Sequence, residues 1–202
     1  MKRLKYIVTT TRRSNPRTRS LAKELARSLP LALKVNRGKA RLTEVIEYAR
    51  SLGATNVIVV GRGLQGNPGR IGIINLSSGY RTHPSLILKL RGVRLARELG
   101  VKPHPPTGIA VAAVDQPSSL ELGHELAAAL NLPLLEGLES VGSAYESVIL
   151  VETLASGLQV VRFVSSEGAP RGPRLLVERY LTVVDSVVRG TDNSENSIAL
   201  GS

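Results

Sequence analysis

The stretch VTTTRRSNPRTRSLAKEL, Val8 to Leu25, passes from a strand-like segment into a helix-like one, and this unit indicates the fold class. Leu4 to Thr10 is rich in β-branched residues and predicts a strand. Ser14 or Asn15 can cap a helix whose first turn contains Pro16. The apolar stripe that predicts this helix repeats every four residues, at Leu21, Leu25 and Leu29.

The turn between these two elements is crowded with positive charge. Its four arginines fall within eight residues, and the nearest acid in the sequence is Glu24. They are Arg12, Arg13, Arg17 and Arg19. Because like charges on a turn repel one another, we expect an anion outside the chain to compensate them. Lys23 and Arg27 continue the charge along the helix, and we favour a binding surface over an ordinary solvated helix face.

Alternating elements continue outward from this unit. Residues 31–35 predict a short strand, residues 40–52 a helix, and residues 56–60 a strand that is buried on both faces. Strand, helix, strand, helix, strand is the order of an α/β layer. A second basic turn, with Arg37 and Lys39, precedes the second helix.

A glycine-rich segment follows, and GRGLQGNPG at 61–69 formally matches the dinucleotide pattern G-x-G-x-x-G. That pattern binds a pyrophosphate where a helix begins at the loop. Here another turn follows and residues 70–76 predict a strand, so we favour a hairpin. Arg62 and Arg70 extend the basic face. A strand at 86–90 comes next, and we predict a short helical turn that carries Arg91, Arg94 and Arg97.

Charge separates the chain into two parts. The net charge is +11 over 202 residues, but residues 1–105 hold 22 Lys and Arg against 4 acids, and residues 106–202 hold 5 against 12. A strongly basic part is typical of binding to nucleic-acid phosphates. The proline-rich segment 101–107 predicts a linker between a basic half, 1–100, and an acidic half, 108–190.

The acidic half repeats the order of elements. Residues 108–114 predict a strand, and Ser118 or Ser119 can cap a helix that ends at Leu130. Two further strands, at 147–154 and 158–164, predict a hairpin. The last segment, 174–188, fits both a helical and a strand period, and we favour a strand because of its β-branched content.

The two halves also share a sequence pattern. KELARSLPLAL at 23–33 is similar to HELAAALNLPLL at 124–135, and in both a helix leads into a short leucine-rich strand. This similarity predicts an internal duplication that produced two similar α/β halves, of which only the first kept its basic residues. Residues 191–202 are polar and predict a disordered tail.

Several functional classes lack support in the sequence. There is no Cys, and His83, His104 and His124 lie far apart, so we expect no thiolate nucleophile, metal site or other cofactor. No run approaches the roughly 18 apolar residues of a membrane span, and the first residues lack the apolar core of a signal peptide. We therefore expect a soluble cytoplasmic protein with no membrane partner.

Three motifs in the opening stretch resemble the signature of the Brix domain, a family of ribosome-biogenesis factors. They are T-T-T-R at 9–12, N-P-R-T-R-S at 15–20 and K-E-L at 23–25. Three later features are similar to the family as well: Arg37-Gly38 before a helix, the strand NVIVV, and G-P-R-L at 172–175. The resemblance identifies residues 1–190 as a Brix domain of the compact archaeal type. One departure is NLSSGYRT at 75–82, where many members have L-P-x-G-P-T.

The resemblance implies RNA binding during pre-rRNA processing and ribosomal subunit assembly, without catalysis. It also implies two pseudo-symmetric α/β halves similar to the anticodon-binding domain of class II aminoacyl-tRNA synthetases. We expect the arginines of the opening turn to hold RNA phosphates, with a wider footprint at Lys23, Arg27, Arg37, Lys39, Arg62 and Arg70. Aromatic residues make up only 3% of the chain, so recognition should depend on the RNA backbone and shape. The acidic half is a candidate contact for basic ribosomal proteins.

Two other functions remain open on the sequence alone. A stand-alone anticodon-binding module acting on tRNA would use the same fold and charge. A small phosphate-binding enzyme would use the loop at 61–69 and Asp115 at a strand end. Neither paired carboxylates nor a P-loop lysine accompanies Asp115, so the enzyme is the weaker alternative.

Overall fold

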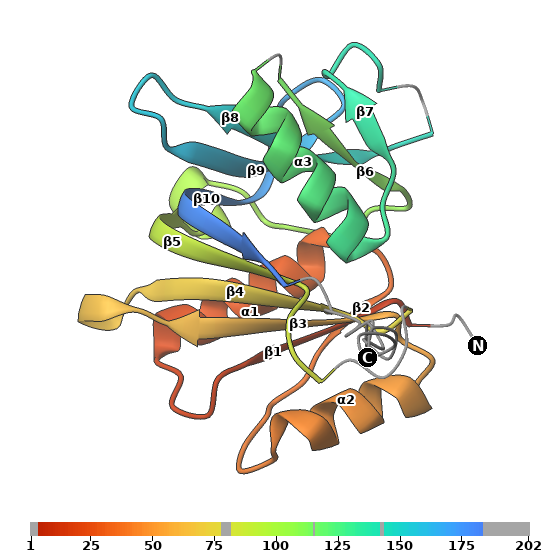
Figure 1. The fold of residues 1–202 in the computed structure, drawn as a ribbon, viewed down its shortest axis with the longest axis vertical. Helices are drawn as coiled ribbons and strands as arrows, with labels where there is room; N and C mark the ends of the chain where they lie inside the picture. The colour runs from red at the N-terminus through yellow and green to blue at the C-terminus, as the bar shows by residue number, and fades with distance from the viewer. Residues whose placement is uncertain (1–3, 78–81, 115, 142–143, 184–202) are drawn as a thin grey trace, which may run out of the picture.

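The computed structural model describes residues 4–77, 82–114, 116–141 and 144–183, and its strands form one ten-stranded mixed sheet (Figure 1). Within the described residues, the basic half supplies five strands, two α-helices and two 3-10 turns. These are β1 (Tyr6–Thr10), α1 (Pro16–Ser28), β2 (Ala32–Lys34), α2 (Leu42–Ser51), β3 (Asn56–Arg62), η1 (Leu64–Gly66), β4 (Pro68–Asn75), β5 (Leu86–Arg94) and η2 (Ala96–Leu99).

The described part of the acidic half supplies the other five strands and one helix. These are β6 (Ile109–Ala113), α3 (Pro117–Leu130), β7 (Leu134–Glu136), β8 (Ser147–Thr153), β9 (Gln159–Ser165) and β10 (Pro170–Thr182). Residues 101–108, which include the predicted linker, connect η2 to β6 without regular secondary structure.

The two halves have the same strand order. Read from its outer edge inward, the basic half runs β2-β1-β3-β4-β5 and the acidic half runs β7-β6-β8-β9-β10. In each half the first strand is parallel to both of its neighbours, and the later strands are antiparallel. The halves join where β5 pairs with β10. This order agrees with two similar halves, whereas their origin by duplication remains a prediction.

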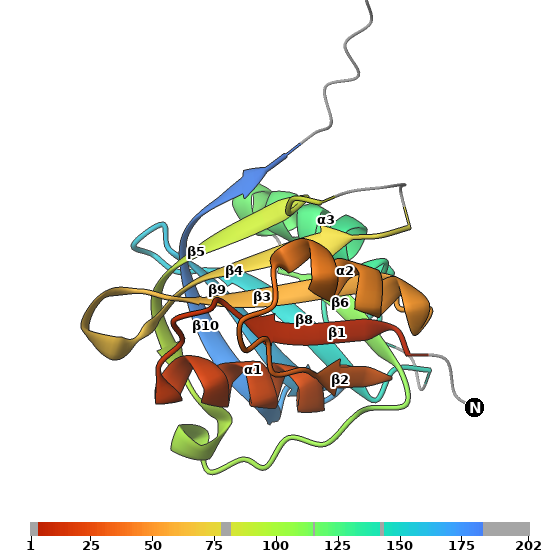
Figure 2. The ribbon, with the colours of Figure 1, turned by 90° about the horizontal axis from the view of Figure 1, so that it is seen from below.

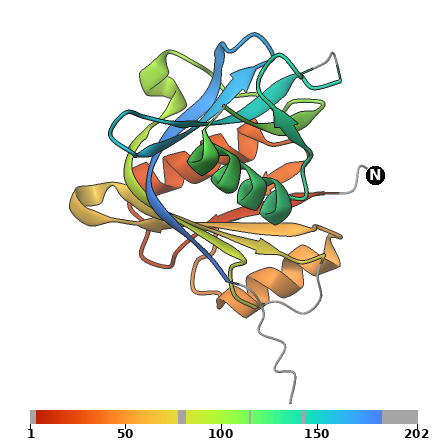
Figure 3. The ribbon, with the colours of Figure 1, turned by 45° about the horizontal axis from the view of Figure 1, so that its top comes forward.

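One hydrophobic core serves both halves. Figure 3 shows α1 and α3 between the two parts of the curved sheet, with α2 on the outside. Helix α1 packs against β1 and β3 and also against β10, and α3 packs against β6 and β8 and also against β4 and β5. Buried side chains of both halves therefore share one cluster, for example Leu21, Leu25, Leu122 and Leu126. A smaller cluster lies under α2, around Ile7, Val45 and Ile46.

Polar side chains of the basic half satisfy the end of α3. The last carbonyl groups of a helix have no partner within it. Here the carbonyl of Leu130 accepts a hydrogen bond from Tyr6 Oη at 3.0 Å, and that of Ala129 accepts one from Asn56 Nδ2 at 2.6 Å. Burial raises the pKa of the Tyr6 hydroxyl, so this group stays neutral and keeps donating. The two halves are thus joined by buried hydrogen bonds as well as by apolar packing.

Most of the predicted elements are confirmed. The hairpin at 61–69 is present as β3, η1 and β4, so the glycine-rich loop contains one 3-10 turn and leads into a strand, not into an α-helix. The two sides of the hairpin approach so closely that glycine is required, because a Cβ at Gly63 would lie 2.7 Å from Gly69 Cα. The strand predicted at 174–188 is confirmed as far as Thr182, and residues 184–202, with the predicted tail, lie outside the described residues.

Two local predictions are wrong. The helix of the acidic half begins after Gln116, with Pro117 in its first turn, so neither Ser118 nor Ser119 is its cap. Arg91 and Arg94 lie in a longer β5, not in a helical turn, and only Arg97 belongs to η2. Pairing with β10 explains the longer strand, since Arg94 lies opposite Arg174. Among the described residues no helix is long and apolar enough to cross a membrane.

Candidate nucleic-acid interface

The opening turn is held tightly at both of its ends. The amide of Thr11 donates to Val60 O at 3.0 Å, which fixes the exit from β1 beside β3. Asn15 caps α1, because its side chain accepts a hydrogen bond from the amide of Thr18 at 2.8 Å. The turn therefore projects Arg12 and Arg13, both exposed, from the carboxyl ends of parallel strands, where α/β sheets commonly bind ligands.

Arg17 has an acidic partner that the local sequence does not show. Its guanidinium donates to both carboxylate oxygens of Glu98, at 2.5 and 2.9 Å, and to Val93 O at 3.0 Å. Figure 2 shows η2, which carries Glu98, beside the start of α1. The expectation that the whole arginine cluster lacks a counter-ion within the chain is therefore wrong at Arg17. We interpret Arg17 as a residue that positions α1.

The pair with Arg17 makes stability depend on pH. The hydrogen bond from Arg17 is the main reason why the pKa of the Glu98 carboxyl lies below its ordinary value. A carboxyl with a lowered pKa stabilises the fold above its unfolded pKa, about 4.3, and this contribution is lost as the pH falls through the folded pKa.

Glu98→Gln is accordingly expected to lower the free energy of unfolding at pH 7, by about 1 kcal/mol for a partly exposed bidentate pair. The variant should lose less stability than the wild type between about pH 5 and pH 3, because it has no carboxyl to titrate at this position. Urea unfolding at both pH values measures the difference. Equal pH dependence in the two proteins would show that the pair does not stabilise the fold.

Arg12 and Arg37 bring the two basic turns together. The Nε atoms of both donate to the carbonyl of Ala40, at 3.5 Å from Arg12 and 3.1 Å from Arg37. The pKa of the Arg37 guanidinium is lowered, first by burial and then by the positive charge of Arg12. Two guanidinium groups thus converge on one neutral acceptor, and a phosphate placed between them would relieve their repulsion.

The other predicted cations of the two turns and of α1 are not part of the Arg12–Arg37 pair. Arg19 donates to Ser14 O at 2.9 Å, and Lys39 is exposed in the second basic turn. Lys23 and Arg27 are exposed along α1. Glu24, the nearest acid in the sequence, accepts a hydrogen bond from the amide of Ala96 at 2.7 Å and so caps η2. Because this carboxylate is directed to η2 and not to Lys23 or Arg27, the exposed stripe on α1 remains positively charged.

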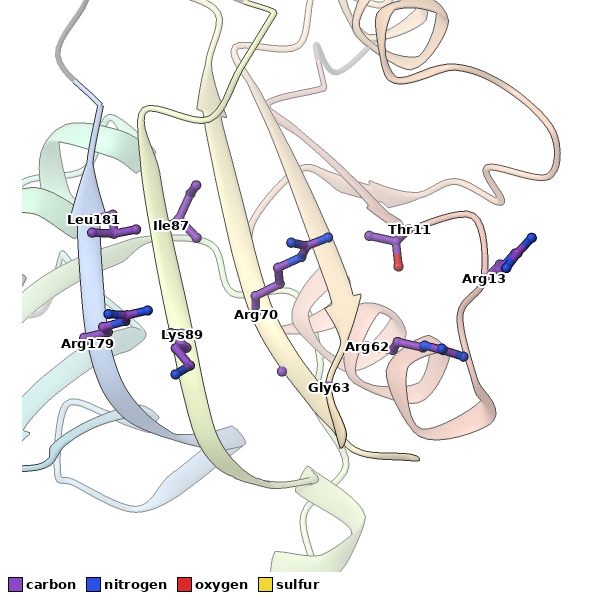
Figure 4. A pocket seen from close by; sticks show the side chains of 10 residues that line it. Thr11, Arg13, Arg62, Gly63, Arg70, Ile87, Lys89, Arg179 and Leu181 are labelled. Atoms are coloured by element: carbon purple, nitrogen blue, oxygen red, sulfur yellow. The ribbon is translucent and has the colours of Figure 1, made fainter. Parts of the chain in front are cut away.

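An open depression of about 610 Å³ lies on the outer face of the sheet, next to the opening turn. Figure 4 shows that its lining comes from the turn and from four neighbouring strands, β3, β4, β5 and β10. The residues that line it are Thr11, Arg13, Arg62, Gly63, Gly69, Arg70, Ile87, Lys89, Arg179 and Leu181.

Five of the residues around this depression are cationic. The structure brings together three that the sequence predicted, Arg13, Arg62 and Arg70. It adds Lys89 and Arg179, which no local sequence pattern predicted. Side chains alternate between the two faces of a strand, so the sequence can indicate which residues of one strand share a face. It does not indicate which strands are neighbours, and only the pairing of β5 with β10 brings Lys89 and Arg179 together. The other predicted cations do not line the depression.

The equivalent strand ends of the acidic half carry the opposite charge. A second depression, of about 470 Å³, lies beyond β6 and β7 and is lined in part by Glu136, Glu139 and Ser140. Asp115, the residue considered for an enzyme, lies outside the described residues. Among the residues that the structure describes, no group of three His, Asp or Glu could hold a metal ion.

The comparisons with known proteins agree on one family. No protein-family model matches the sequence. A relative from Methanopyrus kandleri is 34% identical over 168 residues, which cover 81% of each chain. A relative from Aeropyrum pernix is 35% identical over 91 residues, which cover 45% of this chain and 50% of the relative, so that match spans about half of its length. Both are described as probable Brix domain-containing ribosomal biogenesis proteins.

A solved structure supports the same assignment. The crystal structure of a probable ribosomal biogenesis protein from Aeropyrum pernix is similar with a TM-score of 0.72 at 28% identity. The superposition covers 86% of this chain and 95% of the other. The chain belongs to the family of Brix domain-containing ribosomal biogenesis proteins, as the opening motifs predicted.

Proposed function

We propose that this protein is a non-catalytic, cytoplasmic ribosome-biogenesis factor that binds rRNA during pre-rRNA processing and subunit assembly. The observation that carries the proposal is the convergence of Arg12 and Arg37 on Ala40 O, with Arg13 exposed beside them and unpaired among the described residues. A ribose-phosphate chain supplies the anions that such a cluster lacks. Family membership supports the ribosomal context.

The proposed contacts are exposed or half-buried cations of the basic half. Those at the two turns hold phosphates first, and those along α1 and at the β3–β4 hairpin widen the footprint: Arg12, Arg13, Arg19, Arg37, Lys39, Lys23, Arg27, Arg62 and Arg70. Basic ribosomal proteins are the proposed partners of the acidic half. We also infer that the matching strand orders reflect an internal duplication and a relationship to the anticodon-binding domain.

Binding of labelled rRNA fragments, tRNA and nucleotides to the wild-type protein tests this function. We expect rRNA fragments to bind more tightly than tRNA, and nucleotides to bind weakly. With about five phosphates neutralised at the two turns, log affinity for single-stranded RNA should fall with log salt at a slope of about −3.5 or steeper. Tighter binding of tRNA would favour the tRNA module, and salt-insensitive binding of a nucleotide would favour an enzyme.

A further inference from the structure

Three cations form a row across the outer face of the sheet. Arg70 on β4 lies directly opposite Lys89 on β5, and Lys89 lies directly opposite Arg179 on β10. All three are exposed. Directly opposed residues have Cβ atoms about 4.5–5.5 Å apart, and like charges at this spacing destabilise a sheet. The row is therefore unfavourable for the isolated protein.

The backbone around the row is shaped to present it. The pairing of β10 with β5 shifts register between Val177 and Arg179, so that Glu178 is an extra residue. This bulge lets Val177 stay buried while Arg179 faces Lys89. On the other side, a Cβ at Gly61 would lie 2.6 Å from Arg70 Cγ, so glycine leaves room for Arg70 to extend toward β3.

Within the described residues, only one member of the row has a carboxylate partner. Lys89 Nζ lies 3.1 Å from Glu178 Oε2. That contact is the main cause of the lowered pKa of the Glu178 carboxyl, followed by the charges of Arg91 and Arg179. Arg70 and Arg179 have no ion pair within the part of the chain that the structure describes. The row thus has a positive charge that its surroundings leave largely uncompensated.

An aliphatic row lies beside the cations on the same face. Ile87 pairs with Leu181 on β10 and with Gly72 on β4. Leu181 is 54% exposed, on the part of β10 that pairs with β5 alone, because the pairing of β10 with β9 ends at Val177. Both aliphatic side chains line the same depression as the three cations (Figure 4). Ile87 and Leu181 form an aliphatic floor to the depression, at the next residue pair on the same face of β5 and β10. The face therefore combines anion-binding groups with an adjacent apolar surface.

We propose that this face binds a single-stranded RNA segment, with consecutive phosphates on Arg70, Lys89 and Arg179 and a base against Leu181 and Ile87. In a duplex the bases are stacked inside, so a duplex could use the cations and would leave the aliphatic floor in water. An unstacked base would cover the floor and remove apolar surface from solvent. The inference deepens the proposed RNA-binding function and rests on it. Because β10 comes from the acidic half, the site spans the junction of the two halves.

Three variants test the site, each measured with single-stranded and duplex rRNA fragments over a salt series. Arg70→Gln/Lys89→Gln/Arg179→Gln should make the single-strand salt slope less steep by about 2, since each phosphate contributes about 0.7. Leu181→Thr should weaken single-strand binding roughly threefold to tenfold, with unchanged slope and unchanged duplex affinity. Glu178→Gln should tighten single-strand binding about twofold to fivefold, because it removes the competing carboxylate.

Thermal unfolding controls for folding, and removal of the opposed charges should leave the melting temperature unchanged or raise it. The inference is wrong if the triple variant keeps the wild-type slope, and also if single-strand and duplex binding fall equally while Leu181→Thr has no effect. Variants at Arg12 and Arg19, which do not line the depression, separate the two proposals. If they lose affinity while the row variants do not, the proposed function stands and this site does not. Failure of the wild type to bind any rRNA fragment would overturn both.

Discussion

Replacing Arg12, Arg13 and Arg19 with glutamine is expected to weaken binding of single-stranded rRNA about tenfold to a hundredfold at ~0.1 M salt. Arg12 shares the carbonyl of Ala40 with Arg37, and Arg13 is exposed beside the sheet-face depression. Both are therefore available to phosphates without breaking an ion pair. Fluorescence anisotropy over a salt series measures the effect, and the slope should become less steep by about 2.

Arg17→Gln is the matched control, because it removes a charge from the same turn. Arg17 is already engaged by Glu98 and Val93 O, so its loss should change RNA affinity by less than about threefold. It should instead lower the free energy of unfolding by about 1 kcal/mol. If Arg17→Gln weakens RNA binding as much as the triple variant does, the turn acts through its total charge. The assignment of individual contacts would then be wrong.

Leu122→Ala should lower the free energy of unfolding by about 2–5 kcal/mol and destabilise both halves together. Leu122 belongs to α3 of the acidic half, but it is fully buried in the core that also contains Leu21 and Leu25 of α1. Leu120→Ala, on the same helix, is the control. Leu120 is 36% exposed, so its truncation should cost less than about 1 kcal/mol.

Hydrogen exchange measures how far the destabilisation spreads. Leu122→Ala should increase exchange of the amides in β1 and β3 about as much as in β6 and β8, because one core supports all four strands. Increased exchange that stays within the acidic half would mean that the halves unfold as separate domains. The predicted linker, where the charge changes sign, would then also separate two units that unfold independently.

The local part of the fold could be predicted because strand and helix signals act over short distances. The stripe of Leu21, Leu25 and Leu29, and Pro16 in the first helical turn, are enough to place α1. The order of β3 and β4 followed from a turn between two apolar segments. The cap of α3 was misplaced because serine is a common cap, whereas here Gln116 precedes Pro117 without a side-chain cap.

The rest depends on contacts between distant residues. Arg17 and Glu98 are 81 positions apart, and no local pattern pairs them. Lys89 and Arg179 become neighbours only when β10 pairs with β5 in a register set partly by the bulge at Glu178. A shift of one residue would place Arg179 on the other face. The sequence therefore predicted the basic turn but did not predict the cationic row on the sheet.

Crosslinking of a bound rRNA fragment to the full chain, followed by identification of the crosslinked peptides, tests the central claim most directly. The claim is that the arginine turn and the adjoining sheet face hold the RNA backbone. We predict that crosslinks fall within residues 9–19, 36–40, 61–70, 86–91 and 178–182, and that they disappear as salt is raised. Crosslinks confined to residues 106–170, in the acidic half, would contradict the claim.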